Sequence, residues 1–112
     1  MRTVNLEQGR PDRHTARQLL LGSLRSAKAL GHREVKFIHG YGSHSVGGAI
    51  RREVRAALAD LRDRGEILAF LPGEEFDPFH PACQELIARR WELTRDPDYC
   101  RGNSGITIVI LK

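Results

Sequence analysis

The stretch FIHGYGSHSVGGAIRREV, residues 37–54, stands between an apolar run and an amphipathic one. Residues 34–38 predict a strand, and residues from about 48 to 64 predict a helix because apolar residues recur there at helical spacing. A strand that runs into a glycine-rich turn and then a helix often binds anions, since glycines let backbone N–H groups approach a phosphate and the helix N-terminus adds positive charge. The stretch therefore predicts an α/β unit with a phosphate-binding loop.

The rest of the chain alternates in the same way on both sides of this stretch. Further strands are expected at 3–6, 66–71 and 105–111, and further helices at 12–30 and 81–93. The last helix is expected because about thirty residues between two strands are too many for a structureless connection. The order β-α-β-α-β-(inserted α)-β indicates an α/β fold with helices packed on a mixed sheet.

Composition and charge agree with a small soluble protein. A chain of 112 residues forms one domain at most, and its net charge of +4 permits a nucleic-acid partner without requiring one. The polar N-terminal residues do not resemble a signal peptide, and no apolar run is long enough for a membrane helix. We therefore expect a cytoplasmic protein without a membrane partner, and the sequence leaves its oligomeric state open.

The glycine-rich stretch contains the residues expected to hold a phosphate. They are His39, Gly40, Tyr41, Gly42, Ser43, His44, Gly47, Gly48, Arg51 and Arg52. Arg51 and Arg52 are expected in the first turn of the helix, where cations oppose the helix dipole unless an anion is bound. The alternative is a loop whose glycines only permit left-handed turns, with His39 closing the strand end through hydrogen bonds.

Two common nucleotide-binding motifs are excluded by the residues present. The glycine spacing fits a Walker loop, but Gly48 and Ala49 stand where Lys and Ser or Thr are needed. A dinucleotide fingerprint would need glycine at Ser45. The anion expected at this loop is therefore a nucleic-acid backbone rather than a nucleotide.

Other polar groups are expected to have structural roles. His80, Cys83 and Cys100 are too sparse for a zinc site, so no metal or other cofactor is expected. The acidic residues of 74–77 and 96–98 are expected in solvent, and Trp91 is expected in the core. The polar turn 101–105 precedes the last strand and can lie beside the glycine loop.

Three motifs resemble the Smr (small MutS-related) domain family. They are IHGYG at 38–42, GGAIRREV at 47–54 and NSGITIVIL at 103–111. The resemblance implies a two-layer α/β sandwich similar to the C-terminal domain of translation initiation factor three, and it implies binding of DNA or RNA. It places His39, Gly40 and Gly42 on the family's HGxG motif and Thr107 on its terminal-strand threonine.

The chain is identified as a divergent member because it lacks the LDxHG motif of active family nucleases. Asn5 stands in place of the aspartate, and Glu7 or Gln8 in place of the histidine. We expect one Smr-like domain over residues 1–112, with an insertion at about 74–100, that binds nucleic acid. One alternative is an endonuclease that uses His39 and Glu7 as catalytic residues, with a divalent metal if cleavage occurs. The other is a protein-interaction module that uses the insertion.

Overall fold

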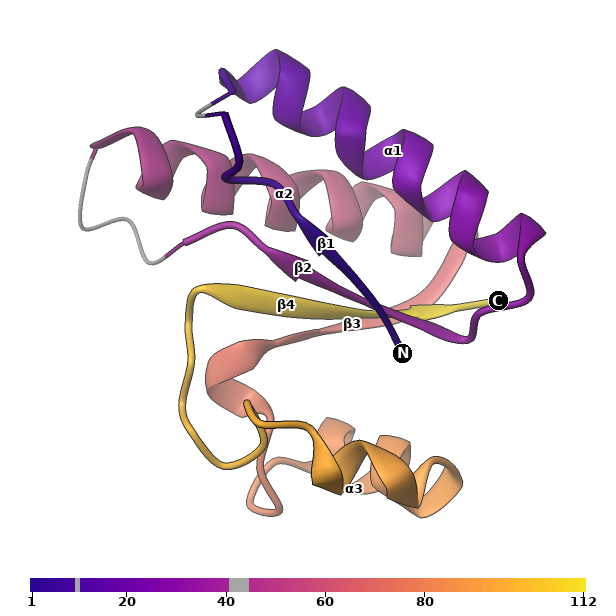
Figure 1. Ribbon diagram of the computed structural model, residues 1–112. Coiled ribbons are helices and arrows are strands. Elements are labelled where there is room, and N and C mark those ends of the chain that lie inside the picture. Colours follow the sequence, from indigo (N-terminus) through magenta and orange to yellow (C-terminus); the bar gives the residue numbers. More distant parts are fainter. Residues whose placement is uncertain (10, 41–44) are drawn as a thin grey trace.

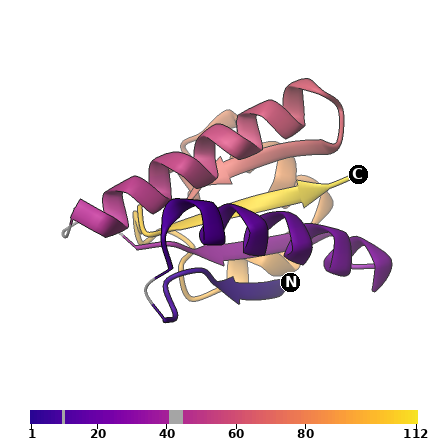
Figure 2. The same cartoon turned by 90° about the horizontal axis from the view of Figure 1, so that it is seen from above.

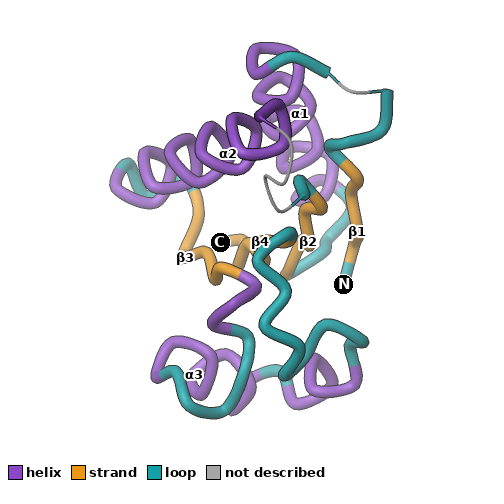
Figure 3. Tube along the Cα trace, turned by 90° about the vertical axis from the view of Figure 1, so that its left-hand side faces the viewer, coloured by secondary structure: helices purple, strands orange, loops and turns teal. Residues whose placement is uncertain are grey.

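A four-stranded mixed sheet forms the centre of the molecule, with two helices on one face and a largely helical segment on the other (Figures 1 and 3). This computed structural model describes residues 1–9, 11–40 and 45–112. The strands are β1 (Arg2–Asn5), β2 (Glu34–Ile38), β3 (Ile67–Pro72) and β4 (Ile106–Leu111). The helices are α1 (Arg13–Ala29), α2 (Ser45–Asp63) and α3 (Pro81–Arg89), with short 3-10 helices η1 (Gly73–Glu75) and η2 (Trp91–Arg95).

The strand order brings distant loops together at one edge of the sheet. The order is β1-β2-β4-β3, with β1 parallel to β2, and β4 antiparallel to both of its neighbours. Consequently β1, β2 and β3 all end at the same edge, here called the carboxyl edge, and β4 begins there. The Leu6 amide donates to the Ile38 carbonyl at 2.8 Å, so the loops after β1 and β2 start side by side.

Helices α1 and α2 cover one face of the sheet, as the view from above shows (Figure 2). The Asp12 side chain caps α1 by accepting from the Thr15 amide at 2.7 Å, as expected of an N-cap aspartate. The apolar stripes predicted on both helices are buried against β2, whose Val35 and Phe37 are fully buried. The helix residues are Ala16, Leu20, Leu24 and Ala27 on α1, and Ile50, Val54, Ala57, Leu58 and Leu61 on α2.

The 74–100 segment covers the opposite face of the sheet. Phe76 and Leu86 from this segment pack with Ile106 and Ile108 of β4 in a second buried cluster. The sheet with α1 and α2 thus forms the predicted sandwich. The 74–100 segment packs on the sheet face opposite these two helices. The confirmed element order is that expected from the sequence.

The expected position of Trp91 in the core is wrong. Helix α3 ends at Arg89, and the backbone at Arg90 leaves the helical conformation, with φ −135° and ψ 66°. The Arg90 guanidinium pairs with the buried Glu34 carboxylate, with Nε and Oε2 2.8 Å apart. The chain therefore turns inward at Arg90, and Trp91 is left 68% exposed.

Buried charges attach the 74–100 segment to β2. Lys36 is 6% exposed, and its Nζ lies 2.9 Å from Asp96 Oδ1 and 2.7 Å from Asp98 Oδ2. Burial alone would lower the pKa of Lys36, but the hydrogen bonds from these carboxylates raise it above its ordinary value. The expectation that both aspartates lie free in solvent is wrong. They neutralise the charge of Lys36 on the face of the sheet that the 74–100 segment covers.

Within the described part of the chain, no helix is long and apolar enough to cross a membrane.

Candidate functional site

The candidate site lies at the carboxyl edge, where backbone hydrogen bonds join two loops. The amides of His39 and Gly40 both donate to the Gly105 carbonyl, at 2.9 and 3.1 Å. The Asn103 side chain closes the turn by accepting from the Gly105 amide at 2.9 Å. The prediction that the 101–105 turn can lie beside the glycine loop is therefore confirmed.

Gly40 has a backbone conformation and a neighbour that both require glycine. Its φ is +85°, in the left-handed region that residues with a Cβ avoid. The Glu7 carboxylate occupies the place where a Cβ on Gly40 would stand. The two candidate residues at the ends of β1 and β2 are thus in close contact.

His39 is fully buried, and both of its ring nitrogens have partners. Nδ1 lies 3.0 Å from the Gly40 carbonyl, and Nε2 lies 2.8 Å from the Thr107 hydroxyl. Because a carbonyl only accepts, Nδ1 carries the proton and donates to Gly40, while Nε2 accepts from Thr107. Burial lowers the pKa of His39 to about 4, and the nearby positive charges of Arg55 and Arg51 act in the same direction. The imidazole is therefore neutral at pH 7.

Arg55 connects α2 to β4 and to the 74–100 segment. Its two terminal nitrogens lie 2.7 and 3.0 Å from the Glu74 carboxylate oxygens, a two-point pairing. Its Nε donates to the Thr107 hydroxyl at 3.3 Å, and Nη2 donates to the Ser104 carbonyl at 3.3 Å. A continuous chain of hydrogen bonds therefore runs from Glu74 through Arg55 and Thr107 to His39.

The hydrogen bonds of Arg55 also affect the ionisation of Glu74. Partial burial raises the pKa of the Glu74 carboxyl, but its hydrogen bonds and the Arg55 charge lower it overall. Glu74 is exposed, as expected of a loop charge, but it also pairs with Arg55 and neutralises it.

Arg51 lies beside the same edge, and Arg52 follows it on α2, both without such neutralisation. Arg51 is half-buried and its Nη1 lies 3.4 Å from the Ser104 hydroxyl, while Arg52 is exposed. Neither forms an ion pair with a carboxylate in the described residues. Two positive charges of α2 therefore remain without a carboxylate partner in the described residues.

The start of α2 differs from the prediction. The helix begins at Ser45, so Gly47 and Gly48 are helical, and Arg51 and Arg52 lie beyond the first turn. Because the helix dipole acts within the first turn, the predicted conflict between these arginines and the dipole is wrong. Tyr41, Gly42, Ser43 and His44, also expected in the site, lie outside the described residues.

The comparisons decide the family. The sequence model of the Smr domain matches residues 10–76, which is more than half of the chain. The chain belongs to the Smr domain family. Its fold is similar to the crystal structure of the Smr domain of Thermus thermophilus MutS2, with 22% identity and a TM-score of 0.59. The alignment covers 100% of this chain and 99% of that chain. No curated protein matches the chain.

The predicted resemblance is thereby confirmed, and with it the fold class. Smr domains are generally associated with nucleic-acid binding or nicking. The structure of this Smr domain brings His39, Gly40, Glu7 and Thr107 together at one edge of the sheet. The expected insertion at 74–100 stays a prediction.

Sequence reasoning missed the role of Arg55 in this Smr domain. The available signal was its spacing, because Arg55 follows Arg51 by four residues and so lies on the same helix face. In the described ranges, 1–9, 11–40 and 45–112, no three His, Cys, Asp or Glu side chains are grouped to hold a metal ion. Both cysteines are free, with Cys83 buried and Cys100 exposed.

Proposed function

We propose that this Smr domain binds nucleic acid by its phosphate backbone at the carboxyl edge of the sheet. The observation that carries the proposal is the contrast between neighbouring arginines on α2. Arg55 is neutralised by Glu74, whereas Arg51 and Arg52 have no carboxylate partner among the described residues. Positive charges of this kind attract phosphate regardless of sequence, so we expect salt-dependent and largely sequence-independent binding.

The glycine loop supplies the second part of the proposed site. Backbone N–H groups of the HGYG stretch, with the side chains of Tyr41, Ser43 and His44, contact the phosphate in this proposal. His39 orders the start of the loop rather than transferring a proton, because its ring is fully buried and both ring nitrogens have partners within the protein. Gly47 and Gly48 add no side chains at the start of α2 that would hinder a backbone.

Fluorescence polarisation with labelled single- and double-stranded DNA and RNA tests this proposal. Arg51→Glu/Arg52→Glu should weaken binding at least about tenfold and lower the salt slope by about two, one for each lost phosphate contact. The matched control is Arg89→Glu/Arg95→Glu, which changes the charge equally on the 74–100 segment. The proposal is wrong if no oligonucleotide binds, or if the two double variants weaken binding equally.

One observation favours endonuclease activity as a second candidate. The Glu7 carboxylate lies against Gly40, so the two residues suggested for catalysis, Glu7 and His39, come from adjacent loops. In this reading Glu7 acts as a base on a water molecule. Glu7→Gln should then abolish cleavage of labelled DNA or RNA in magnesium or manganese while binding is retained. Intact substrate with the wild-type protein under all these conditions would exclude endonuclease activity and leave nucleic-acid binding as the proposed function.

A further inference from the structure

Arg55 is held by the sheet on one side and by a single exposed carboxylate on the other. Its Nε donates to the Thr107 hydroxyl at 3.3 Å, and its Nη2 donates to the carbonyls of Ser104 and Ile106 at 3.3 and 3.4 Å. These partners belong to β4 and the turn before it, so they position the guanidinium without help from Glu74. The Glu74 carboxylate pairs with Nη1 and Nη2 from the other side, at 3.0 and 2.7 Å, and its side chain is 41% exposed.

The backbone next to Glu74 is packed tightly against the same turn. Gly73 begins η1 and is buried, and a Cβ on it would collide with the Asn103 carbonyl oxygen and the Ile106 side chain. The position of the Glu74 backbone is thereby set, while its side chain can leave Arg55 by rotating into solvent. Because exposed ion pairs are held only weakly, this departure costs little free energy.

Two arginines of α2 act on the Glu74 carboxylate. Arg51 and Arg55 are four residues apart, so they lie on the same face of the helix. Both reach Ser104, since Arg51 Nη1 lies 3.4 Å from its hydroxyl and Arg55 donates to its carbonyl. Partial burial raises the pKa of the Glu74 carboxyl, whereas hydrogen bonds from Arg55 and the charges of Arg55 and Arg51 lower it overall. The carboxylate thus lies where both positive charges attract an anion.

We infer that the Glu74 carboxylate holds the place of a phosphate on Arg55 and is displaced when a nucleic-acid strand binds. This inference rests on the proposed function, and it adds Arg55 to the residues that contact the phosphate backbone. Arginine pairs with phosphate in the same two-point geometry as with a carboxylate, so one anion can replace the other on Nη1 and Nη2. Glu74 is then an internal competitor that lowers the affinity of the site for nucleic acid.

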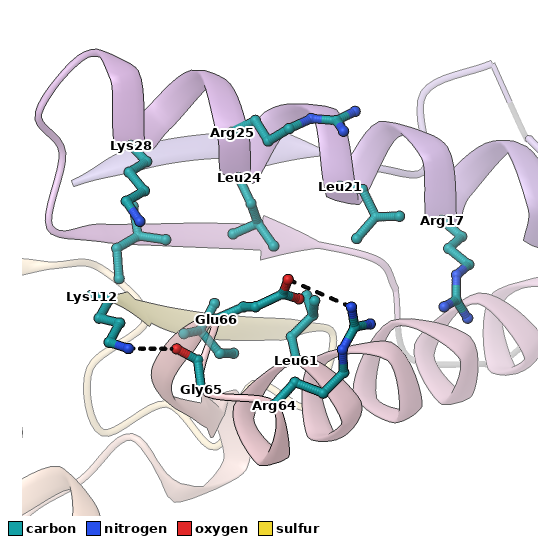
Figure 4. Close-up of a pocket in the computed structure, with 12 residues that line it drawn as sticks. Arg17, Leu21, Leu24, Arg25, Lys28, Leu61, Arg64, Gly65, Glu66 and Lys112 are labelled. Atoms are coloured by element: carbon teal, nitrogen blue, oxygen red, sulfur yellow. Dashed lines mark hydrogen bonds and ion pairs between the residues drawn. The ribbon is translucent and has the colours of Figure 1, made fainter.

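A different arginine–carboxylate pair, in the groove between α1 and α2, supplies a control (Figure 4). Glu66 and Arg64 pair there through a single nitrogen–oxygen contact of 3.6 Å, and the Arg64 side chain is 59% exposed. Arg64 also contacts Asp60 of its own helix, at 3.2 Å. Replacing Glu66 therefore removes a carboxylate from an exposed arginine that is not positioned by β4, at a distance from the carboxyl edge.

Fluorescence polarisation with labelled DNA and RNA oligonucleotides measures the competition. Glu74→Gln keeps the size of the side chain and removes its charge, and it should tighten binding about three- to fivefold, as expected when a weak exposed ion pair is lost. Glu66→Gln and Glu75→Gln remove the same charge from the groove and from the residue next to Glu74, and they should change the affinity less. Tightening by Glu74→Gln that does not exceed the effect of both controls would overturn the inference.

A double-mutant cycle identifies the residue on which Glu74 acts. Arg55→Gln should weaken binding, and adding Glu74→Gln to it should give no gain, because the arginine that the carboxylate occupies is absent. A gain of the same size as in the wild type would reduce Glu74 to a general electrostatic effect and overturn the inference, with the proposed function left intact. If circular dichroism shows that Arg55→Gln is unfolded, Arg55→Lys replaces it, since lysine keeps the charge without the two-point pairing. An undiminished gain in that protein would likewise overturn the inference.

Inorganic phosphate separates a failure of this inference from a failure of the proposed function. If no oligonucleotide binds the wild-type protein, the proposed function is wrong, and displacement is tested with phosphate alone in an NMR titration that follows the side-chain N–H signals of Arg55. Half-maximal shifts should then require several-fold less phosphate in Glu74→Gln than in the wild type. Equal phosphate concentrations in the two proteins, or no shift in either, would overturn the inference.

Discussion

Replacing His39 by glutamine should remove most of the acid sensitivity of folding between about pH 7.5 and pH 5. The pKa of His39 is about 4 in the folded protein, because the ring is buried, against an ordinary value of 6.5. The unfolded chain therefore binds a proton at this residue before the folded protein does. Stability that is present above the unfolded pKa is lost as the pH falls from about 6.5 toward 4.

The size of this effect follows from the two pKa values. The full difference corresponds to about 3 kcal/mol of unfolding free energy, of which about 2 kcal/mol is lost by pH 5. Between about pH 7.5 and pH 5, the contribution of the histidine to the pH dependence of stability is separate from that of the paired carboxyl groups. The pKa values of Asp98 and Glu74 lie below their ordinary values because of hydrogen bonds to Lys36 and Arg55 that outweigh burial, so both remain ionised at pH 5.

Urea denaturation followed by circular dichroism at about pH 7.5 and pH 5 measures the effect. The wild type should lose about 2 kcal/mol over this range, and His39→Gln should lose much less, whatever its stability at the higher pH. His14→Gln removes an exposed histidine from α1 and should behave like the wild type. An undiminished pH dependence in His39→Gln would refute the reasoning, as would an NMR titration of His39 centred near its ordinary pKa.

Two further substitutions test how the site and the 74–100 segment are held. Lys36→Met should lower the unfolding free energy by about 2–3 kcal/mol in urea titrations at pH 7, because it leaves the Asp96 and Asp98 carboxylates without their buried partner. The triple variant with both aspartates changed to asparagine should recover part of that loss, and no recovery would contradict this explanation. Gly40→Ala should lower the melting temperature through a positive φ and a collision with Glu7. Adding Glu7→Ala should relieve only the collision, leaving about 1–2 kcal/mol of backbone strain, so full recovery would argue against the strain.

The fold was predictable because most of its signals are local. Apolar residues such as Leu20 and Leu24 on α1, or Val54 and Leu58 on α2, mark one helix face within a few residues of each other. The close approach of Gly40 and the 101–105 turn followed from strands that end or begin at one edge. Local periodicity therefore predicts the helices and strands, and the direction of the strands predicts where the site lies.

Pairings between distant residues were not predictable in this way. Lys36 and Asp98 are 62 positions apart, and nothing near either residue indicates the other. Charged residues are usually exposed, so the aspartates were assigned to solvent. The place of Trp91 was not predictable for a related reason, because its neighbour Arg90 pairs with Glu34, which lies 56 positions away on β2. The buried charges of β2, Glu34 and Lys36, were therefore not predictable from the sequence, although both pair with the 74–100 segment.

These buried charges make the 74–100 segment an integral part of the fold. Its removal would expose the face of the sheet that it covers, where Ile106 and Ile108 are buried, and would leave Lys36 without its two carboxylate partners. It would also remove the Glu74 carboxylate that pairs with Arg55. Arg55 donates to the Thr107 hydroxyl, which in turn contacts His39. A deletion would therefore disturb the core and the candidate site together. Single substitutions at the ion pairs are needed to separate the two effects, because Lys36 joins the segment to β2 whereas Arg55 joins it to α2.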